Sequence, residues 1–351
     1  MKMKKLLCIA LAAMMVLALA ACGSQSQTSE NGDPSASPEG ETDASPAAES
    51  SAPEGEATGE TYVIGICQQM THEALDAATQ GFKDALTELL GADAVEFRDQ
   101  NAGGEQPNCT TIMNGFVSEG MDLILANATW PLQAAASATA DIPILGTSVT
   151  DYATALGITD WTGTVGGNIS GTSDLAPLDQ QAEMIQELFP DATNVGLLYC
   201  SGEPNSVYQI ETIRTYLEDM GYVCEAYAFT DVNDLSSVTQ TACDNSDVIY
   251  IPTDNTAASN TETIANVVIP AGVPVIAGES GICSGCGVAT LSISYYDLGY
   301  TTGEMAAQIL TGEADISTMA IQSAPNVTKM YNAANCEALG VTIPDDYVVI
   351  E

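Results

Sequence analysis

Basic residues are scarce in this chain of 351 residues. Lysine and arginine together number seven against 47 aspartates and glutamates, histidine occurs once, and the formal net charge is −40. An acidic surface of this strength repels polyanions, so the composition excludes nucleic acid as a partner. The charge is explained by solubility or, alternatively, by electrostatic steering of a cationic ligand.

Several motifs of enzymes are missing too. The chain has no Gly-x-Ser-x-Gly elbow, no Gly-x-Gly-x-x-Gly turn after its first strand-like run, and no glycine-rich phosphate loop ending in lysine. His72-Glu73 lacks the second histidine of the zinc-protease helix, because residue 76 is aspartate. These absences argue against a hydrolytic or nucleotide-dependent enzyme and leave only paired carboxylates as a route to catalysis.

The N-terminus carries an export signal. Lysines precede an apolar run of fifteen residues at 6–20, whereas a membrane-spanning helix needs about twenty, so we expect a signal peptide over residues 1–21. Leu19-Ala20-Ala21-Cys22 resembles the bacterial lipobox. This motif predicts a diacylglycerol anchor on Cys22 at the outer face of the cytoplasmic membrane; the alternative is an ordinary signal peptide with an incidental cysteine.

A low-complexity segment follows the cysteine. Residues 22–60 contain nine acidic residues, no basic residue and no aromatic residue, a composition that cannot bury enough apolar surface to fold. We expect a disordered acidic tether. Residues 61–351 are long enough for two lobes with separate cores.

Hydrophobic periodicity in residues 61–351 alternates between short β-branched runs and amphipathic helices. In the first half, strands are predicted at 62–67, 95–97, 123–126 and 143–149, and helices between Thr71 and Gly91, at 106–119 and at 132–140. Thr71 can cap the first helix, whose apolar face includes Leu75 and Leu89. In the second half, strands are predicted at 195–200, 222–229, 248–251 and 273–277, and helices at 178–189, 207–220, 235–243 and 257–268. Two such series predict an α/β fold of two doubly wound parallel-sheet lobes, with a hinge and a ligand cleft between them.

Polar loops follow the predicted strands. Ligands of parallel sheets bind at the carboxyl ends of strands, beside helix N-termini. The loops in question are 68–72, 127–131, 147–151, 202–206, 253–255 and 278–280. Three come from each half, and their hydroxyls, amides and carboxylates suit a small zwitterion.

Five short motifs support a family resemblance. They are Ala74-Leu75-Asp76 before Gly81-Phe82-Lys83, Ile142-Pro143-Ile144 before Val149-Thr150-Asp151, Gly202-Glu203-Pro204-Asn205-Ser206, Thr253-Asp254-Asn255, and Leu298-Gly299 before Ile309-Leu310-Thr311-Gly312. In this order they resemble substrate-binding lipoproteins of ABC importers, in the tryptophan/tyrosine-binding group with a type I periplasmic-binding-protein fold. The resemblance covers nearly everything after the tether.

The resemblance implies a domain organisation and partners. In this fold the chain crosses between the lobes three times, so we expect an N-terminal lobe of 61–175 plus 290–315 and a C-terminal lobe of 176–289 plus 316–351. The implied partners are a small-molecule ligand, an ABC permease and its ATPase, with the protein itself a monomer. No cofactor is implied.

Two features depart from the family pattern. Trp130 stands where a small residue or proline is more usual, which bears on the identity of the ligand. Cys283-Ser-Gly-Cys286 inserts after the last predicted strand of the second lobe. This pair either forms a local disulfide or stays reduced, and no second pair or nearby histidine completes a metal site.

The candidate ligand contacts come from the polar loops. Backbone N–H groups at helix starts, assisted by the hydroxyls of Thr129, Ser148 and Ser206, can hold a carboxylate without arginine. The ammonium group needs a carboxylate, for which Asp254 is the first choice and Asp151 the second.

Other candidates remain open between two roles. Asn205 either caps its own helix or bonds the ligand. Trp130 either stacks on the ligand or packs in the core, and His72 is either a surface residue or a cleft contact. Asn255 and Glu279 complete the predicted set, and Gln69 is a weaker candidate.

Together these features predict a lipid-anchored, extracytoplasmic solute-binding protein that delivers a small organic ligand to an ABC importer by closure of its two lobes. The favoured ligand is an aromatic or apolar amino acid. A sensory module that presents its ligand to a membrane receptor is the alternative from another class, and a hydrolytic enzyme is a more remote one.

Overall fold

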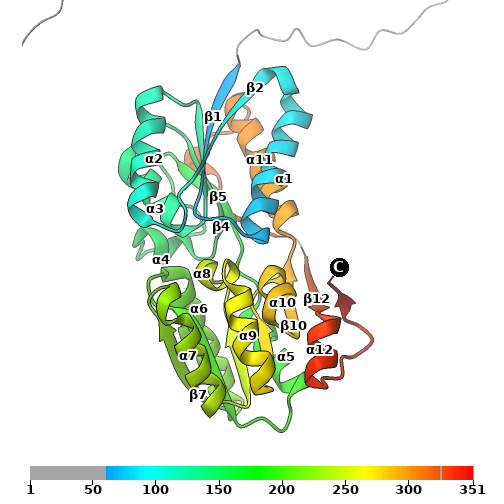
Figure 1. Ribbon diagram of the computed structural model, residues 1–351. Helices are drawn as coiled ribbons and strands as arrows, with labels where there is room; N and C mark the ends of the chain where they lie inside the picture. The colour runs from blue at the N-terminus through cyan, green and yellow to red at the C-terminus, as the bar shows by residue number, and fades with distance from the viewer. Residues whose placement is uncertain (1–60, 325, 351) are drawn as a thin grey trace, which may run out of the picture. The chain divides into compact units, whose positions relative to one another are not determined.

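The computed structural model describes residues 61–324 and 326–350 (Figure 1). The predicted signal peptide, Cys22 and the predicted tether lie outside the described residues. Within the described part, no helix combines the length and the apolar character that crossing a bilayer requires.

The first lobe is built on a six-stranded sheet in the order β11-β5-β4-β3-β1-β2, and its strand pairings are parallel. Its strands are β1 (Tyr62–Gln68), β2 (Val95–Asn101), β3 (Leu123–Asn127), β4 (Ile144–Val149), β5 (Ile169–Ser173) and β11 (Gln322–Ser323). Its helices are α1 (Glu73–Leu90), α2 (Gln106–Glu119), α3 (Thr129–Ala138), α4 (Tyr152–Leu156), α11 (Tyr295–Leu310) and the short η1 (Ala92–Ala94) and η2 (Ile316–Thr318).

Helices cover both faces of this sheet. On one face α1 packs beside α11, where Phe82 and Met305 meet Ile64 and Leu125 of the sheet (Figure 1). On the other face α2, α3 and α4 form a second buried cluster over strands β3 and β4. Burial on both faces explains the nearly continuous apolar runs from which these strands were predicted.

The second lobe contains a seven-stranded sheet in the order β13-β12-β10-β9-β8-β6-β7, parallel except for the β10–β12 pair. Its strands are β6 (Asn194–Cys200), β7 (Val223–Phe229), β8 (Val248–Ile251), β9 (Val275–Ala277), β10 (Ala289–Ile293), β12 (Val327–Tyr331) and β13 (Val348–Val349). Its helices are α5 (Leu178–Leu188), α6 (Pro204–Asp219), α7 (Val232–Asn245), α8 (Asn255–Ala258), α9 (Thr261–Ala271), α10 (Ser280–Cys286) and α12 (Ala333–Leu339).

Alternating residues of the central strands serve the two faces of the second sheet. Val248 and Tyr250 pack with α5 and α6, whereas Ile249 and Ile251 pack with α7, α9 and α10. This period of two is the one expected of a strand that is buried on both sides. The predicted fold class, two doubly wound parallel-sheet lobes, is therefore confirmed.

Three connections join the lobes. The first lies between β5 and α5, where the boundary at 175/176 was predicted, and the other two lie at other positions than predicted. The chain leaves the first sheet after β5, returns to the first lobe between β10 and α11, and leaves again between β11 and β12. Residues 290–293 therefore belong to the second sheet, and residues 316–323 stay with the first lobe. The predicted boundaries at 289/290 and 315/316 differ from the structure because β10 and β11 were not predicted as strands.

Several local predictions also need correction. Helix α1 begins after His72, whose side chain makes no capping hydrogen bond, so Thr71 is not its cap. Leu89, predicted on the buried face, is 50% exposed. The segment 257–268 forms two helices, α8 and α9, and Cys283 and Cys286 lie on helix α10 as free, buried thiols instead of in a loop.

Candidate functional site

Polar residues gather where the strands of the first sheet end. Gln68 pairs with Asn127, and Asn127 pairs with Thr147, so β1, β3 and β4 end at the same edge. We call the loops at this edge, residues 68–72, 101–105, 127–131 and 147–151, the first rim. The corresponding loops of the second lobe, residues 200–206, 229–232 and 252–260, are the second rim.

Hydrogen bonds connect the two rims directly. His72 Nε2 lies 3.1 Å from Asn255 Oδ1. Ser259 donates from its hydroxyl to the carbonyl oxygen of Thr71 at 3.2 Å and lies 2.9 Å from the sulfur of Met70. The predicted ligand loops of the two lobes therefore face each other across one interface.

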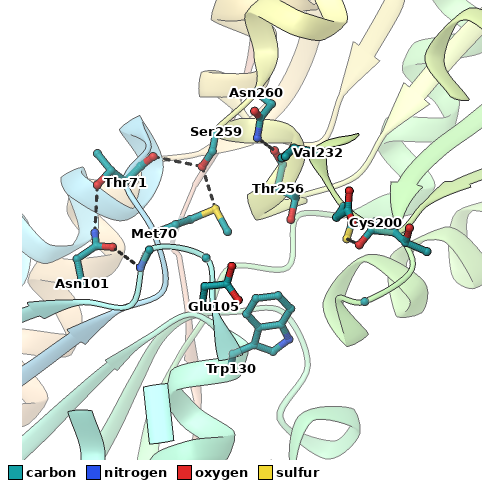
Figure 2. A pocket seen from close by; sticks show the side chains of 15 residues that line it. Met70, Thr71, Asn101, Glu105, Trp130, Cys200, Val232, Thr256, Ser259 and Asn260 are labelled. Atoms are coloured by element: carbon teal, nitrogen blue, oxygen red, sulfur yellow. Dashed lines mark hydrogen bonds between the residues drawn. The ribbon is translucent and has the colours of Figure 1, made fainter. Parts of the chain in front are cut away.

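A cavity of about 470 Å³ lies between the rims (Figure 2), within the range of about 300–1,000 Å³ that small-molecule sites usually occupy. Its lining from the first rim is Met70, Thr71, Asn101, Gly103, Gly104, Glu105 and Trp130, and from the second rim Cys200, Gly202, Thr230, Asp231, Val232, Thr256, Ser259 and Asn260. A ligand in this cavity would touch both lobes.

Trp130 is the predicted site residue that lines this cavity. It is half-buried at the start of α3, its ring packs against the apolar cluster under the sheet, and its backbone N–H donates to Gln69 Oε1 at 3.3 Å. The two roles left open for Trp130 are thus compatible, because one side of the side chain packs while another faces the cavity.

Backbone strain marks the first rim. Ala128 has a φ of 94° and Ser148 a φ of 54°, and these are the non-glycine residues with positive φ in the described part of the chain. Ala128, Ser148 and Thr129, which follows Ala128, are all buried. Residues held in such sparsely populated conformations tend to cluster at ligand sites.

Asp254, the first choice for the ammonium group, serves the second lobe instead. Its carboxylate accepts hydrogen bonds from the backbone N–H groups of Cys200 at 2.7 Å and of Ala257 at 2.8 Å, which caps α8. The side chain is 1% exposed and lies outside the lining of the cavity. Burial, together with the neighbouring Glu203, raises the pKa of Asp254 to about 7.

Glu203, a buried residue outside the predicted site, organises the second rim. Its carboxylate accepts from the backbone and side chain of Asn255, from the backbone and side chain of Thr256, and from Asn205. The signal in the sequence is that Glu203 directly precedes Pro204, because proline often occupies the first position of a helix.

The remaining predicted residues fall into three groups. Asp151 caps α4 through Thr154 N–H at 2.6 Å, and Glu279 caps α10 through two backbone N–H groups, with burial raising its pKa to about 7. Asn205 and Ser206 are buried at the start of α6. His72 and Asn255 bond each other, and burial lowers the pKa of His72.

The cavity is also lined by residues that were not predicted from the sequence. Asn101 is the last residue of β2, Glu105 comes from the loop that follows, and Ser259 comes from the turn between α8 and α9. The two glycines at 103 and 104 were the available signal, since both adopt positive φ between a strand and a helix. Figure 2 shows Glu105 beside Trp130 at the cavity.

Comparison with known proteins gives consistent matches. A family model described as ABC transporter substrate binding protein matches residues 63–350. A tyrosine-binding protein from Clostridioides difficile (strain R20291) is 35% identical over 253 residues, which cover 72% of this chain and 73% of the relative.

Two solved structures of similar proteins, one with a bound ligand and one open and ligand-free, allow the arrangement of the lobes to be compared. A domain from Streptococcus pneumonia in complex with L-Trp has a TM-score of 0.79 and 31% identity, covering 83% of this chain and 100% of the other. A ligand-free, open substrate-binding protein with adhesive properties from Clostridium difficile has a TM-score of 0.65 and 33% identity, covering 83% and 99%. At similar identity, the structure is thus nearer to the complex than to the open form.

The fold, the facing rims and these matches agree. Chains of such similarity are substrate-binding proteins, which fits the absence of enzyme motifs from the sequence. The chain belongs to the family of ABC transporter substrate-binding proteins, with the fold of type I periplasmic binding proteins.

Proposed function

We propose that this protein is the lipid-anchored solute-binding component of an ABC importer and that it binds an aromatic amino acid between its lobes. The proposal rests chiefly on one observation, the cavity that both rims line and that has Trp130 in its wall. Relatives that bind tyrosine or carry tryptophan support an aromatic ligand.

The cavity wall combines an apolar surface with surrounding polar groups, as binding of an aromatic side chain requires. Met70, Trp130 and Val232 supply apolar surface, and an aromatic ring stacked on Trp130 gains about 0.5–1.5 kcal/mol beyond the burial of its area. Hydroxyls and amides of Thr71, Asn101 and others surround this surface. Larger apolar side chains would gain most from this wall.

Lobe closure couples binding to recognition by a transporter. Contacts from both rims to one ligand exist together only when the lobes are closed, so the ligand shifts the equilibrium toward the closed form by its differential affinity. A permease that recognises the closed form would then distinguish loaded from empty protein.

Ligand identity is tested with purified residues 61–351. We expect L-tyrosine, L-tryptophan or L-phenylalanine to raise the melting temperature and to bind in calorimetry, because only the protein with closed lobes gains these contacts. Sugars, nucleosides and small polar amino acids serve as controls. Stabilisation by a sugar or nucleoside and by no amino acid would refute the proposed ligand class.

The anchor is tested separately on the full chain. In the bacterial host, Cys22→Ser should move the protein from the membrane fraction to the soluble fraction, since residue 22 then lacks the thiol that carries the lipid. Unchanged membrane fractionation would contradict lipidation at Cys22 without affecting the ligand assignment.

A further inference from the structure

Buried polar atoms without partners gather where the two rims meet. Among the described residues, the buried side-chain atoms that have no hydrogen-bond partner are Gln69 Nε2, Asn127 Oδ1, Ser148 Oγ, Asp174 Oδ1, Asn205 Oδ1 and Thr290 Oγ1. An unpaired buried polar group costs about 1–3 kcal/mol, so each one calls for a partner. Four of them, on Gln69, Asn127, Ser148 and Asn205, belong to the rims.

The orientation of Gln69 leaves a hydrogen-bond donor. Its side chain is fully buried, and its Oε1 accepts the backbone N–H of Trp130 at 3.3 Å. The amide nitrogen Nε2 can only donate, and it remains unpartnered at the start of α3. An acceptor on a ligand would satisfy it.

Ser148 brings a second donor to the same place. The backbone N–H of Ala128 bonds the carbonyl oxygen of Thr147 at 3.0 Å, and that of Gln69 bonds the carbonyl oxygen of Asn127 at 3.2 Å. These bonds set Gln69 and Ser148 on either side of the chain that enters α3. Each side of this helix start therefore carries one side chain with a free donor, and a carboxylate has two oxygens that can accept.

Asn205 supplies an acceptor from the other lobe. Its amide nitrogen donates to the carbonyl oxygen of Thr253 at 3.0 Å and to Glu203 at 3.1 Å, so the side-chain oxygen is the atom left over. Asn205 is 6% exposed. One turn later, Gln209 lies 3.5 Å from the hydroxyl of Thr150, two residues beyond Ser148, so this part of α6 adjoins the first rim.

The other unpartnered atoms point elsewhere. The amide nitrogen of Asn127 bonds Leu75 O and Thr79 Oγ1, which turns the side chain toward α1. Asp174 bonds the hydroxyl of Tyr295 where two interlobe connections meet. Thr290 lies within strand β10 of the second sheet. These three atoms are therefore left out of the set assigned to a ligand, although Asn127 belongs to the first rim.

We infer that Gln69 Nε2 and Ser148 Oγ bind the α-carboxylate of the amino acid and that Asn205 Oδ1 accepts a hydrogen bond from its ammonium group. The inference rests on the proposed function and goes beyond it by assigning the charged groups of the ligand to opposite lobes. Like Asp254, these three residues are buried and do not line the cavity, but they keep unpartnered atoms where the carboxylate of Asp254 is already hydrogen-bonded. The ligand side chain alone would occupy the cavity, past Trp130. Recognition needs no cation, and none of the four basic residues in residues 61–351 lines the cavity.

An isosteric exchange tests the carboxylate contact. Gln69→Glu keeps the oxygen that accepts the N–H of Trp130 and replaces the free donor by an acceptor. In calorimetry at pH 8, we expect the wild type to bind L-tyrosine more tightly than L-tyrosinamide. In the variant, the ratio of the two dissociation constants should shift toward L-tyrosinamide by about tenfold or more, because a carboxamide can donate a hydrogen bond to the introduced side chain where a carboxylate cannot.

Two further variants test the assignment independently, in case Gln69→Glu does not fold. Ser148→Gly removes the hydroxyl and suits the positive φ, and it should weaken L-tyrosine about tenfold with a smaller effect on L-tyrosinamide. Asn205→Ala should weaken L-tyrosine while leaving 3-(4-hydroxyphenyl)propanoate, which lacks the ammonium group, nearly unchanged.

The outcomes separate the two proposals. If the wild type binds no amino acid, the proposed function fails and takes the inference with it. If the wild type binds L-tyrosine but Gln69→Glu and Ser148→Gly change both ligands equally or not at all, the carboxylate assignment alone is overturned. Equal losses of L-tyrosine and the propanoate in Asn205→Ala overturn the ammonium assignment.

Discussion

The contact between His72 and Asn255 predicts a pH-dependent closure of the lobes. His72 is the single histidine of the chain, and its Nε2 lies 3.1 Å from the side-chain oxygen of Asn255 in the other lobe. The amide nitrogen of Asn255 donates to Glu203 at 2.7 Å. Its oxygen therefore faces the imidazole, and neutral His72 donates from Nε2.

Removing this hydrogen bond should weaken ligand binding by a modest factor. A hydrogen bond between neutral groups contributes about 0.5–1.5 kcal/mol, which corresponds to a roughly two- to tenfold change in an equilibrium constant. His72→Ala should therefore raise the apparent dissociation constant of L-tyrosine by about that factor, because the closed form becomes less populated. Calorimetry at pH 8 measures the change.

The sign of the pH effect follows from the pKa of His72. Burial lowers this pKa in the structure, outweighing the Asn255 hydrogen bond and the carboxylates of Glu203 and Asp76, which raise it. An open protein exposes the ring and returns the pKa toward about 6.5. The closed form thus binds fewer protons, so affinity is complete above about pH 6.5 and falls as the pH drops through the lowered pKa.

A single histidine makes the assay direct. In untagged protein labelled with 13C-histidine, one ring resonance reports His72, and its pKa should be lower with saturating L-tyrosine than without ligand. Calorimetry between pH 5 and pH 8 should show less pH dependence in His72→Gln than in the wild type. Identical histidine pKa values in the two states would refute the reasoning.

Three other results are expected. Trp130→Ala should weaken L-tyrosine and L-tryptophan about tenfold in calorimetry, because the stacking surface is lost; unchanged affinity would place the ring elsewhere. Gly299→Ala should lower the free energy of unfolding in urea by about 3 kcal/mol or more, since its Cβ would lie 1.9 Å from the carbonyl oxygen of Ala78. Gly115→Ala, whose Cβ meets nothing within 4 Å, should stabilise α2 by roughly 0.5–1 kcal/mol and is the matched control. The pKa of Asp254, raised by burial to about 7, should make the folded protein lose up to about 4 kcal/mol of stability as the pH rises from about 4 to about 7. In Asp254→Asn, urea unfolding at pH 5 and pH 8 should show a smaller difference than in the wild type, and an equal difference would contradict the shift.

Local sequence signals were sufficient for much of the fold. The helix predicted at 106–119 and the strand predicted at 248–251 have the same bounds in the structure, as α2 and β8. Both carry strong local patterns, and the alternation of such elements was enough to predict two parallel-sheet lobes. The strands that escaped prediction, such as β5 with the sequence Ile-Ser-Gly-Thr-Ser, are short or polar and owe their conformation to neighbouring strands.

The sequence by itself determined the fold class, the family and five of the seven loops that form the two rims, because hydrophobic period, turn residues and short motifs are local properties. Only the tertiary structure decided what each polar side chain does there. Asp254 was predicted to bind a ligand, but two backbone N–H groups from different segments of the second lobe occupy its carboxylate. Gln69 was only a weaker candidate, yet its contact with Trp130 leaves a buried donor at the interface. Hydrogen-bond partners distant in sequence make this distinction, since they determine which polar atoms remain available to a ligand.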